Sequence, residues 1–144
     1  MTYRSIRAII ENQEVVSAAG SMTVREAARL MKERRVGAIL VVEQGKLAGV
    51  FTERDVVFRV VAEDRDVRTM PVAEVMTRDP QTIHPDKPFP DALHLMYEGG
   101  FRHVPVVEDG RPVGVISARD ALGPELEDFI YELLRREQAS DILA

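Results

Sequence analysis

The chain contains an internal repeat, and this feature limits the available folds more than any other. Residues 45–57 read GKLAGVFTERDVV, and residues 110–122, 65 positions later, read GRPVGVISARDAL. At this offset residues 23–57 align with residues 88–122 without a gap and share 12 of 35 residues. Because both copies must form the same unit, a fold with room for only one is excluded. The repeat predicts a molecule with internal pseudo-symmetry.

Each copy has the hydrophobic pattern of one helix and two strands. Apolar residues at helical spacing come first, and a short β-branched run, a tight turn and a second apolar run follow. Thr23 and Glu26 form a predicted capping box at the first helix, where the second copy has Pro88 and Asp91. The predicted strands are residues 38–42, 47–51, 104–107 and 112–116, and a second helix is expected directly after Thr52 and after Ser117.

Shorter segments complete the predicted organisation. Strands near residues 15–18 and 81–83 open the units, which gives each repeat the order β-α-β-β-α. Neither repeat alone covers both faces of its helices, so the two are expected to pack as one pseudo-symmetric α+β module. The expected boundaries are 1–70 for the first repeat, 71–124 for the second, and 125–144 for an extension with an amphipathic helix.

Composition excludes several classes of function. The 144 residues carry a formal net charge of −5, which disfavours nucleic acids and anionic membranes as partners. The lack of cysteine excludes disulfides, thiolate metal sites and a cysteine nucleophile. Neither a signal peptide nor a membrane-spanning stretch is recognisable, so a cytoplasmic location is expected. The three histidines lack the spacing of a helical metal site, and no catalytic set is recognisable, so neither a metal centre nor an enzyme is predicted.

The repeated motif has a structural and a ligand-binding interpretation. Residues 52–55 (TERD) and 117–120 (SARD) both have the hydroxyl–x–x–carboxylate pattern of a helix capping box. Each motif also follows an apolar strand directly, where backbone amides and the helix dipole favour an anion. A carboxylate one turn into the helix can accept hydrogen bonds from a ribose diol. Gly49 and Gly114 could let a flat ring approach each strand. Together these features favour a nucleoside that carries a phosphate.

The string apolar–Gly–apolar–apolar–Thr/Ser–x–x–Asp, duplicated in tandem, resembles a pair of cystathionine β-synthase (CBS) domains, the Bateman module. The resemblance covers roughly residues 5–123. In that family the hydroxyl and the aspartate usually bind the ribose and phosphate of adenosyl ligands such as AMP, ATP or NAD, and the modules act as regulators. The resemblance implies two ligand sites, at Thr52/Asp55 and at Ser117/Asp120, and no catalytic cofactor. It also implies association of the modules into dimers.

Further site residues follow from the resemblance. The segment PVAEVMT is similar to the linker that touches the base in these proteins, which points to Val75 and Met76. The segment SIRAII is less similar and suggests Ile9 and Ile10 in the same role.

The residues just before the middle strand often face phosphate in this family. The second copy has Arg102 and His103 there, and the first copy has Gly37 and Ala38. Positive charge is therefore expected mainly near Ser117 and Asp120. The remaining members of the expected ligand-binding set are Val36, Gly37, Ser17 and Thr82.

A rival function is compatible with the same sequence: a module for dimerisation or partner docking in which both clefts stay unused. A homodimer is expected under either interpretation, and a regulated protein partner is a further expectation. The C-terminal helix supports association, because its apolar residues would otherwise face water. These residues are Leu126, Phe129, Ile130, Leu133 and Leu134.

Overall fold

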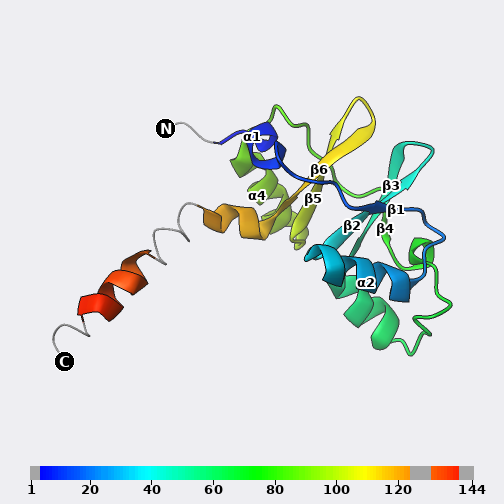
Figure 1. Ribbon diagram of the computed structural model, residues 1–144. Coiled ribbons are helices and arrows are strands. Elements are labelled where there is room, and N and C mark those ends of the chain that lie inside the picture. Colours follow the sequence, from blue (N-terminus) through cyan, green and yellow to red (C-terminus); the bar gives the residue numbers. More distant parts are fainter. Residues whose placement is uncertain (1–3, 124–130, 140–144) are drawn as a thin grey trace.

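The computed structural model describes residues 4–123 and 131–139. Two bodies lie side by side in it, one for each repeat (Figure 1). Each body holds a β-hairpin and one long helix, which is α2 (Val24–Arg34) in the first repeat and α4 (Phe89–Gly99) in the second. The predicted α+β class and the two repeats are confirmed.

Both long helices begin as the sequence predicts. The Thr23 hydroxyl accepts a hydrogen bond from the Glu26 N–H at 3.2 Å, and the Glu26 carboxylate accepts one from the Thr23 N–H at 3.3 Å. Pro88 precedes α4 without a side-chain cap. The two helices end in the left-handed conformation, with φ of 56° at Arg35 and 70° at Gly100.

Four strands form the sheet of the first repeat, in the order β1-β2-β3-β4. Its centre is the antiparallel hairpin of β2 (Ala38–Glu43) and β3 (Lys46–Thr52). β1 (Ser17–Ala18) pairs parallel with β2, and β4 (Thr77–Arg78) pairs antiparallel with β3. Since β4 comes from the start of the second repeat, this segment forms the edge of the first sheet.

The hairpin of the second repeat copies that of the first in detail. It consists of β5 (His103–Glu108) and β6 (Arg111–Ser117). The register shifts between Val106 and Val107, 65 residues after the same shift in β2, and both hairpin turns have two consecutive positive φ angles. The strand expected at 81–83 is reduced to one parallel bridge between Ile83 and Val106.

The helix predicted after each motif is short and irregular. In the first repeat α3 (Glu53–Asp55) continues as a π-helix, η1 (Val56–Val61). In the second repeat the motif begins a 3-10 helix, η3 (Ala118–Leu122). Another 3-10 helix, η2 (Val72–Glu74), lies at the start of the second repeat. π-Helical turns are rare and are frequent at functional sites, whereas 3-10 turns are common at helix ends, so the two copies of the motif begin helices of different kinds.

Each core is completed by a segment from outside its own repeat. The helix α1 (Ile6–Ile10) lies at the start of the first repeat but packs into the core of the second, against Ile83 and Phe89. Conversely, the start of the second repeat packs into the first core, beside Phe51. The buried residues of that segment are Val72, Val75 and Met76.

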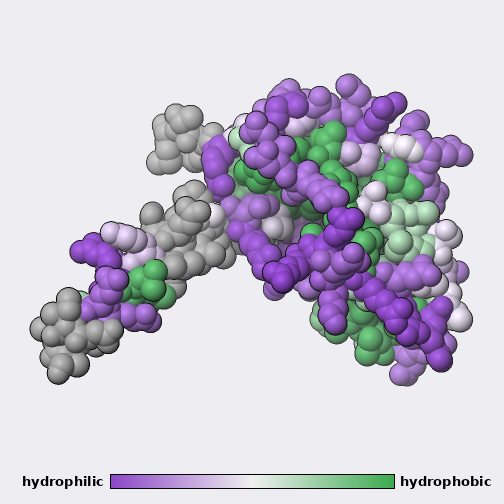
Figure 2. All heavy atoms as spheres, in the orientation of Figure 1, coloured by the Kyte–Doolittle hydropathy of each residue, from purple (hydrophilic) through white to green (hydrophobic). Residues whose placement is uncertain are grey.

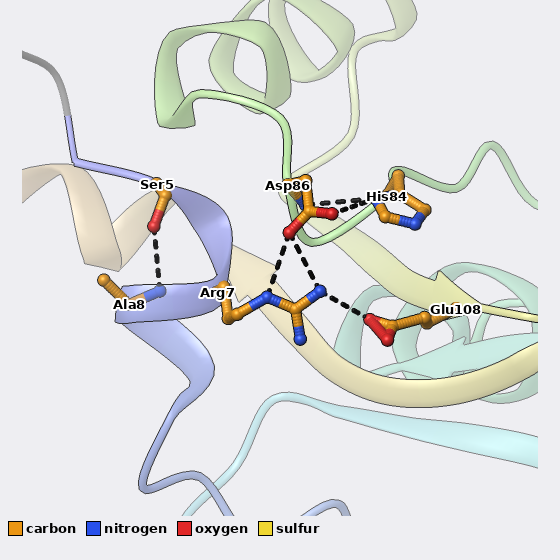
Figure 3. A network of polar contacts seen from close by, with 6 residues as sticks. All are labelled: Ser5, Arg7, Ala8, His84, Asp86 and Glu108. Atoms are coloured by element: carbon orange, nitrogen blue, oxygen red, sulfur yellow. Dashed lines mark hydrogen bonds and ion pairs between the residues drawn. The ribbon is translucent and has the colours of Figure 1, made fainter.

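Arg7 ties α1 to the second repeat (Figure 3). Its Nε donates a hydrogen bond to Asp86 at 3.0 Å, and its Nη2 donates one to Glu108 at 2.7 Å. The hydrogen bond to Glu108, followed by that to Asp86, raises the pKa of Arg7. The Ser5 hydroxyl accepts from the Ala8 N–H and caps the helix. Because these charges are exposed, they orient α1 more than they stabilise the fold.

A third apolar cluster joins the two repeats. Ala38, Leu40 and Val50 of the first hairpin are buried together, and Val115 of β6 packs against them. The strands β3 and β6 are in contact, so the two hairpins meet through their sheets. The repeats therefore form one module, as expected.

The C-terminal extension is described only in part. Residues 131–139 are helical and stand apart from the two repeats (Figure 1). Leu133 and Leu134 are 43% and 53% exposed, whereas Leu126, Phe129 and Ile130 lie outside the described residues. Within 4–123 and 131–139, no helix combines the length and the apolar composition needed to cross a membrane.

Candidate functional site

Two clefts lie beside the two copies of the motif. The Ser117 cleft has a volume of about 690 Å³ and is bordered by Ser117 and Asp120. The Thr52 cleft has a volume of about 540 Å³ and is bordered by Thr52 and Asp55. Both volumes are typical of small-molecule sites. The structure thus brings each predicted hydroxyl–carboxylate pair to the wall of a cleft that a nucleotide could enter.

Each motif is hydrogen-bonded within its own repeat, to the residue that precedes the middle strand. The Glu53 N–H donates to the Gly37 carbonyl at 3.0 Å, and the Ala118 N–H donates to the Arg102 carbonyl at 2.9 Å. The first residues of both motif helices are therefore held at the start of a central strand. Of the predicted residues at these starts, Gly37 and Val36 border the Ser117 cleft, beside the motif of the second repeat.

In the Thr52 cleft the motif is fully engaged within the protein. The Asp55 Oδ2 accepts hydrogen bonds from the Thr52 N–H at 2.8 Å and the Thr52 hydroxyl at 3.2 Å. The other oxygen, Oδ1, lies 3.4 Å from Nε of Arg59, one turn along η1. Arg59 also donates to the carbonyls of Val75 and Met76. Asp55 is 7% exposed, so this carboxylate has little capacity left for a ligand.

In the Ser117 cleft the same motif keeps a carboxylate oxygen available. The Asp120 Oδ2 accepts from the Ser117 N–H at 2.7 Å and from its hydroxyl at 3.4 Å. Among the described residues, Oδ1 of Asp120 has no hydrogen-bond or ion-pair partner, and the side chain is only half-buried. The position that corresponds to Arg59 holds proline, Pro124, which lies outside the described residues. The capping and ligand-binding interpretations are therefore compatible here.

Arg102, His103 and Glu53 border both clefts. A Cβ atom at Gly37 would lie 3.0 Å from Oε1 of Glu53 and 3.4 Å from Nε2 of His103, so the glycine leaves room for both side chains. Burial is the main cause that lowers the pKa of His103, with Arg102 acting in the same direction and Glu53 and Asp120 opposing it. His103 is thus a mainly neutral group at neutral pH. The expectation that Arg102 and His103 serve mainly the Ser117 site must be widened, because they face the Thr52 cleft as well.

The predicted base-contacting residues do not border either cleft. Val75 and Met76 are 2% and 5% exposed in the first core, and Ile10 is 7% exposed in the second core, with Ile9 packed beside it. Their apolar side chains fill the cores because the two segments that carry them close the opposite repeats. The residues that follow in each segment reach the clefts instead, at Thr77 and at Gln13.

The two glycines serve this packing and not a flat ligand. A Cβ atom at Gly49 would lie 2.5 Å from Sδ of Met76, and one at Gly114 would lie 2.8 Å from Cγ2 of Ile10. No L side chain fits at such distances, so glycine is required where the closing segment crosses the strand. The proposed approach of a ring to these strands is therefore wrong.

Ser17 and Thr82 also lie away from both clefts. Both are exposed, and Ser17 is used in the pairing of β1 with β2, opposite Leu40. The residues just before them border the clefts, namely 14–16 in the Ser117 cleft and 79–81 in the Thr52 cleft. The sequence prediction therefore placed the cleft residue of each short strand a few positions too late in the chain.

Gln13 and Arg35 border the Ser117 cleft, and the repeated motif did not predict either of them. Gln13 donates through Nε2 to the Val115 carbonyl at 2.9 Å and accepts from the Val115 N–H at 2.7 Å. Arg35, the second residue of the pair Arg34-Arg35, ends α2 and borders the Ser117 cleft. Its conformation, not its sequence pattern, draws attention to it.

The family model described as CBS domain matches residues 6–62 and again residues 72–124. This chain belongs to the CBS domain family. The CBS domain-containing protein YhcV of Bacillus subtilis (strain 168) is 40% identical over 107 residues, which cover 74% of this chain and 76% of that protein. The chain spans 20–21% of the length of several larger CBS domain-containing proteins of Arabidopsis thaliana that it also matches.

Solved CBS structures have the same fold. The CBS domain protein PAE2072 from Pyrobaculum aerophilum, complexed with AMP, has a TM-score of 0.74 and 29% identity, over 81% of this chain and 89% of that one. The CBS domain pair of protein MJ0100, in complex with 5′-methylthioadenosine and S-adenosyl-L-methionine, has a TM-score of 0.75 and 26% identity, over 82% and 96%. The resemblance inferred from the repeated motif is confirmed.

Proposed function

We propose that this CBS pair is a regulatory module that binds an adenosine-containing nucleotide in the Ser117 cleft and transmits its occupancy through a homodimer. The observation that carries the proposal is Asp120 at the wall of this cleft, whose Oδ1 has no hydrogen-bond or ion-pair partner in the part of the chain that the structure describes. A buried or half-buried carboxylate oxygen favours a hydrogen-bond donor, and a ribose diol supplies two.

The rest of the cleft suits the other parts of such a ligand. Valine side chains border it, and they could contact the faces of an adenine base. Arginines border it as well, and one guanidinium group can donate two hydrogen bonds at once to the oxygens of a phosphate. The four valines are Val15, Val16, Val36 and Val115, and the arginines are Arg35, Arg102 and Arg119.

The ligands of the two related structures support an adenosyl compound. AMP, 5′-methylthioadenosine and S-adenosyl-L-methionine share an adenosine unit and differ in what is attached to its 5′ carbon. The shared unit is the part that Asp120 and the valines would hold. AMP, ADP, ATP and NAD are the candidates, and the module itself performs no catalysis.

A second candidate function is a dimerisation or docking module without a nucleotide. The observation that favours it is the ion pair between Asp55 and Arg59, which occupies the carboxylate of the Thr52 cleft from within the chain. In that cleft the motif acts as a capping element.

Ligand-dependent thermal stabilisation separates the two functions. The melting temperature is measured with AMP, ADP, ATP, NAD and S-adenosylmethionine in turn. A ligand at 100 times its Kd should add about 2.7 kcal/mol to the free energy of unfolding. We expect at least one compound to raise the melting temperature of the wild type, and Asp120→Ala to remove the effect. If all five leave it unchanged at millimolar concentration, the docking function replaces the nucleotide function.

A further inference from the structure

Arg35 adopts a backbone conformation that is unfavourable for its residue type. It ends α2 with φ of 56° and ψ of 45°, in the left-handed region. The same position in the second repeat, 65 residues later, is Gly100, with φ of 70°. Glycine is the usual residue at such a helix end because any Cβ atom makes the conformation costly. The first repeat therefore has a strained arginine at the position where the second has an unstrained glycine.

Strained backbone conformations cluster at functional sites, and Arg35 is one of the residues that border the Ser117 cleft. Arg102 and Arg119 border the same cleft. Among the described residues, none of these three guanidinium groups forms an ion pair. The adjacent Arg34, in contrast, is paired with Glu14 at 2.6 Å. Three arginines from both repeats thus border one cleft, and within residues 4–123 and 131–139 none of them has a carboxylate partner.

The Thr52 cleft lacks this arrangement. Gly100 stands in place of Arg35. Three arginines border this cleft, and apart from Arg102, which borders both clefts, they are already engaged within the protein. Arg59 is paired with Asp55, and Arg54 donates to the Gly100 carbonyl at 3.3 Å and lies over the ring of Phe58. The excess of available guanidinium groups is therefore specific to the Ser117 cleft.

We propose that Arg35 is a specificity-determining residue of the Ser117 cleft and selects ligands with an adenosine 5′-diphosphate moiety over adenosine and AMP. This inference rests on the proposed nucleotide function. Ribose at Asp120 would direct the 5′ carbon toward the arginines. A single phosphate can be held by one or two guanidinium groups, and two linked phosphates offer oxygens to all three.

The substitution Arg35→Gly tests the proposal, because it should change stability and affinity in different directions. Glycine relieves the left-handed strain, so the melting temperature of the free protein should equal or exceed that of the wild type. Affinity for ADP should fall about 10- to 100-fold, the scale of hydrogen bonds to charged groups. Affinity for adenosine should stay within about twofold. Calorimetric titration with adenosine, AMP, ADP, ATP and NAD measures the affinities, and a thermal unfolding curve of the free protein measures the melting temperature.

Two variants serve as controls. Gln44→Gly changes another left-handed residue, with φ of 53°, in the β2–β3 turn away from both clefts, and it should leave every affinity unchanged. Arg35→Lys keeps the charge and the strain, and it should retain part of the preference for ADP. The ATP and NAD arms identify which ligand supplies the diphosphate moiety.

The outcomes are distinguishable. If the wild type binds none of the five compounds, the nucleotide function and this inference both fail. If the wild type binds adenosine compounds but the ratio of ADP to adenosine affinity is the same in Arg35→Gly, only the role of Arg35 is refuted. Equal losses for adenosine and ADP would make Arg35 a structural residue of the cleft and would equally refute the inference.

Discussion

Asp55 and Asp120 occupy equivalent positions of the repeat but differ in what surrounds them. Asp55 is buried and shares its two oxygens between Thr52 and Arg59. Asp120 is half-buried and has one oxygen without a partner among the described residues. The residue four positions after each aspartate also differs, Arg59 in the first repeat and Pro124, outside the described residues, in the second. At the scale of single residues, the same motif can therefore serve mainly the fold in one copy and a ligand in the other.

Replacing each aspartate with alanine should separate these roles. Asp55→Ala leaves the Thr52 N–H without its acceptor and Arg59 without its ion-pair partner, and it should lower the free energy of unfolding by about 1–3 kcal/mol. Asp120→Ala should weaken AMP binding by about 1.5–3 kcal/mol and leave the fold cooperative. Urea unfolding and calorimetric titration of both variants provide the numbers. An unchanged affinity with a reduced stability in Asp120→Ala would reduce Asp120 to a helix cap.

At the scale of elements, the two sheets are edged in different ways. β4 pairs with Val50 of β3 through its backbone. At the equivalent place in the second repeat, the carboxamide of Gln13 bonds both the N–H and the carbonyl of Val115. A side-chain amide has the same donor and acceptor as a peptide group, so Gln13 substitutes for one residue of an edge strand.

Removing this carboxamide should expose the edge of β6. Gln13→Ala leaves one donor and one acceptor of Val115 without protein partners, so we expect a loss of about 1–2 kcal/mol in the free energy of unfolding. Asn12→Ala, at the exposed neighbouring position, is the matched control and should change stability by less than about 0.5 kcal/mol. Chemical denaturation of the two variants checks this. Equal stabilities would mean that water replaces the carboxamide without loss.

The elements were largely predictable from the sequence, and the contacts of the cleft were predictable only in part. The repeat specifies the hairpins and long helices because hydrophobic spacing and turn residues act locally. The cap at Thr23 is a clear example. The side chains of Val75 and Ile10 were assigned to the clefts, because a motif does not reveal which repeat a preceding segment closes. Arg35 was missed because a φ angle has no signature in a pair of arginines.

At the scale of the whole molecule, exposed apolar surface on η1 points to self-association. Val57, Phe58 and Val61 are 53%, 60% and 61% exposed. Figure 2 shows hydrophobic surface gathered at the lower edge of the view, over this helix. Three large apolar side chains on adjacent turns form a contiguous patch, and such patches often mark interfaces.

We expect a symmetric dimer whose interface includes this helix. The double variant Val57→Glu/Val61→Glu should shift the protein toward the monomer, because burying two carboxylates in an apolar interface is unfavourable. Its monomer should remain as stable as before, since both side chains already face water. Sedimentation across the micromolar range distinguishes the species. A wild type that is monomeric throughout this range, or a variant that stays dimeric, would contradict the expectation.

The exchange of closing segments has a consequence for the order in which the protein can mature on the ribosome. Helix α1 emerges first, but Ile83 and Phe89, which cover it, are synthesised much later. The first repeat likewise waits for Val75 and Met76, which follow it in the chain. Neither half can finish folding as soon as its own repeat has been translated, although domains generally fold in order from the N-terminus. Nascent chains that stop short of the second repeat should therefore hold an apolar N-terminal helix without its binding surface, a state that a chaperone could recognise.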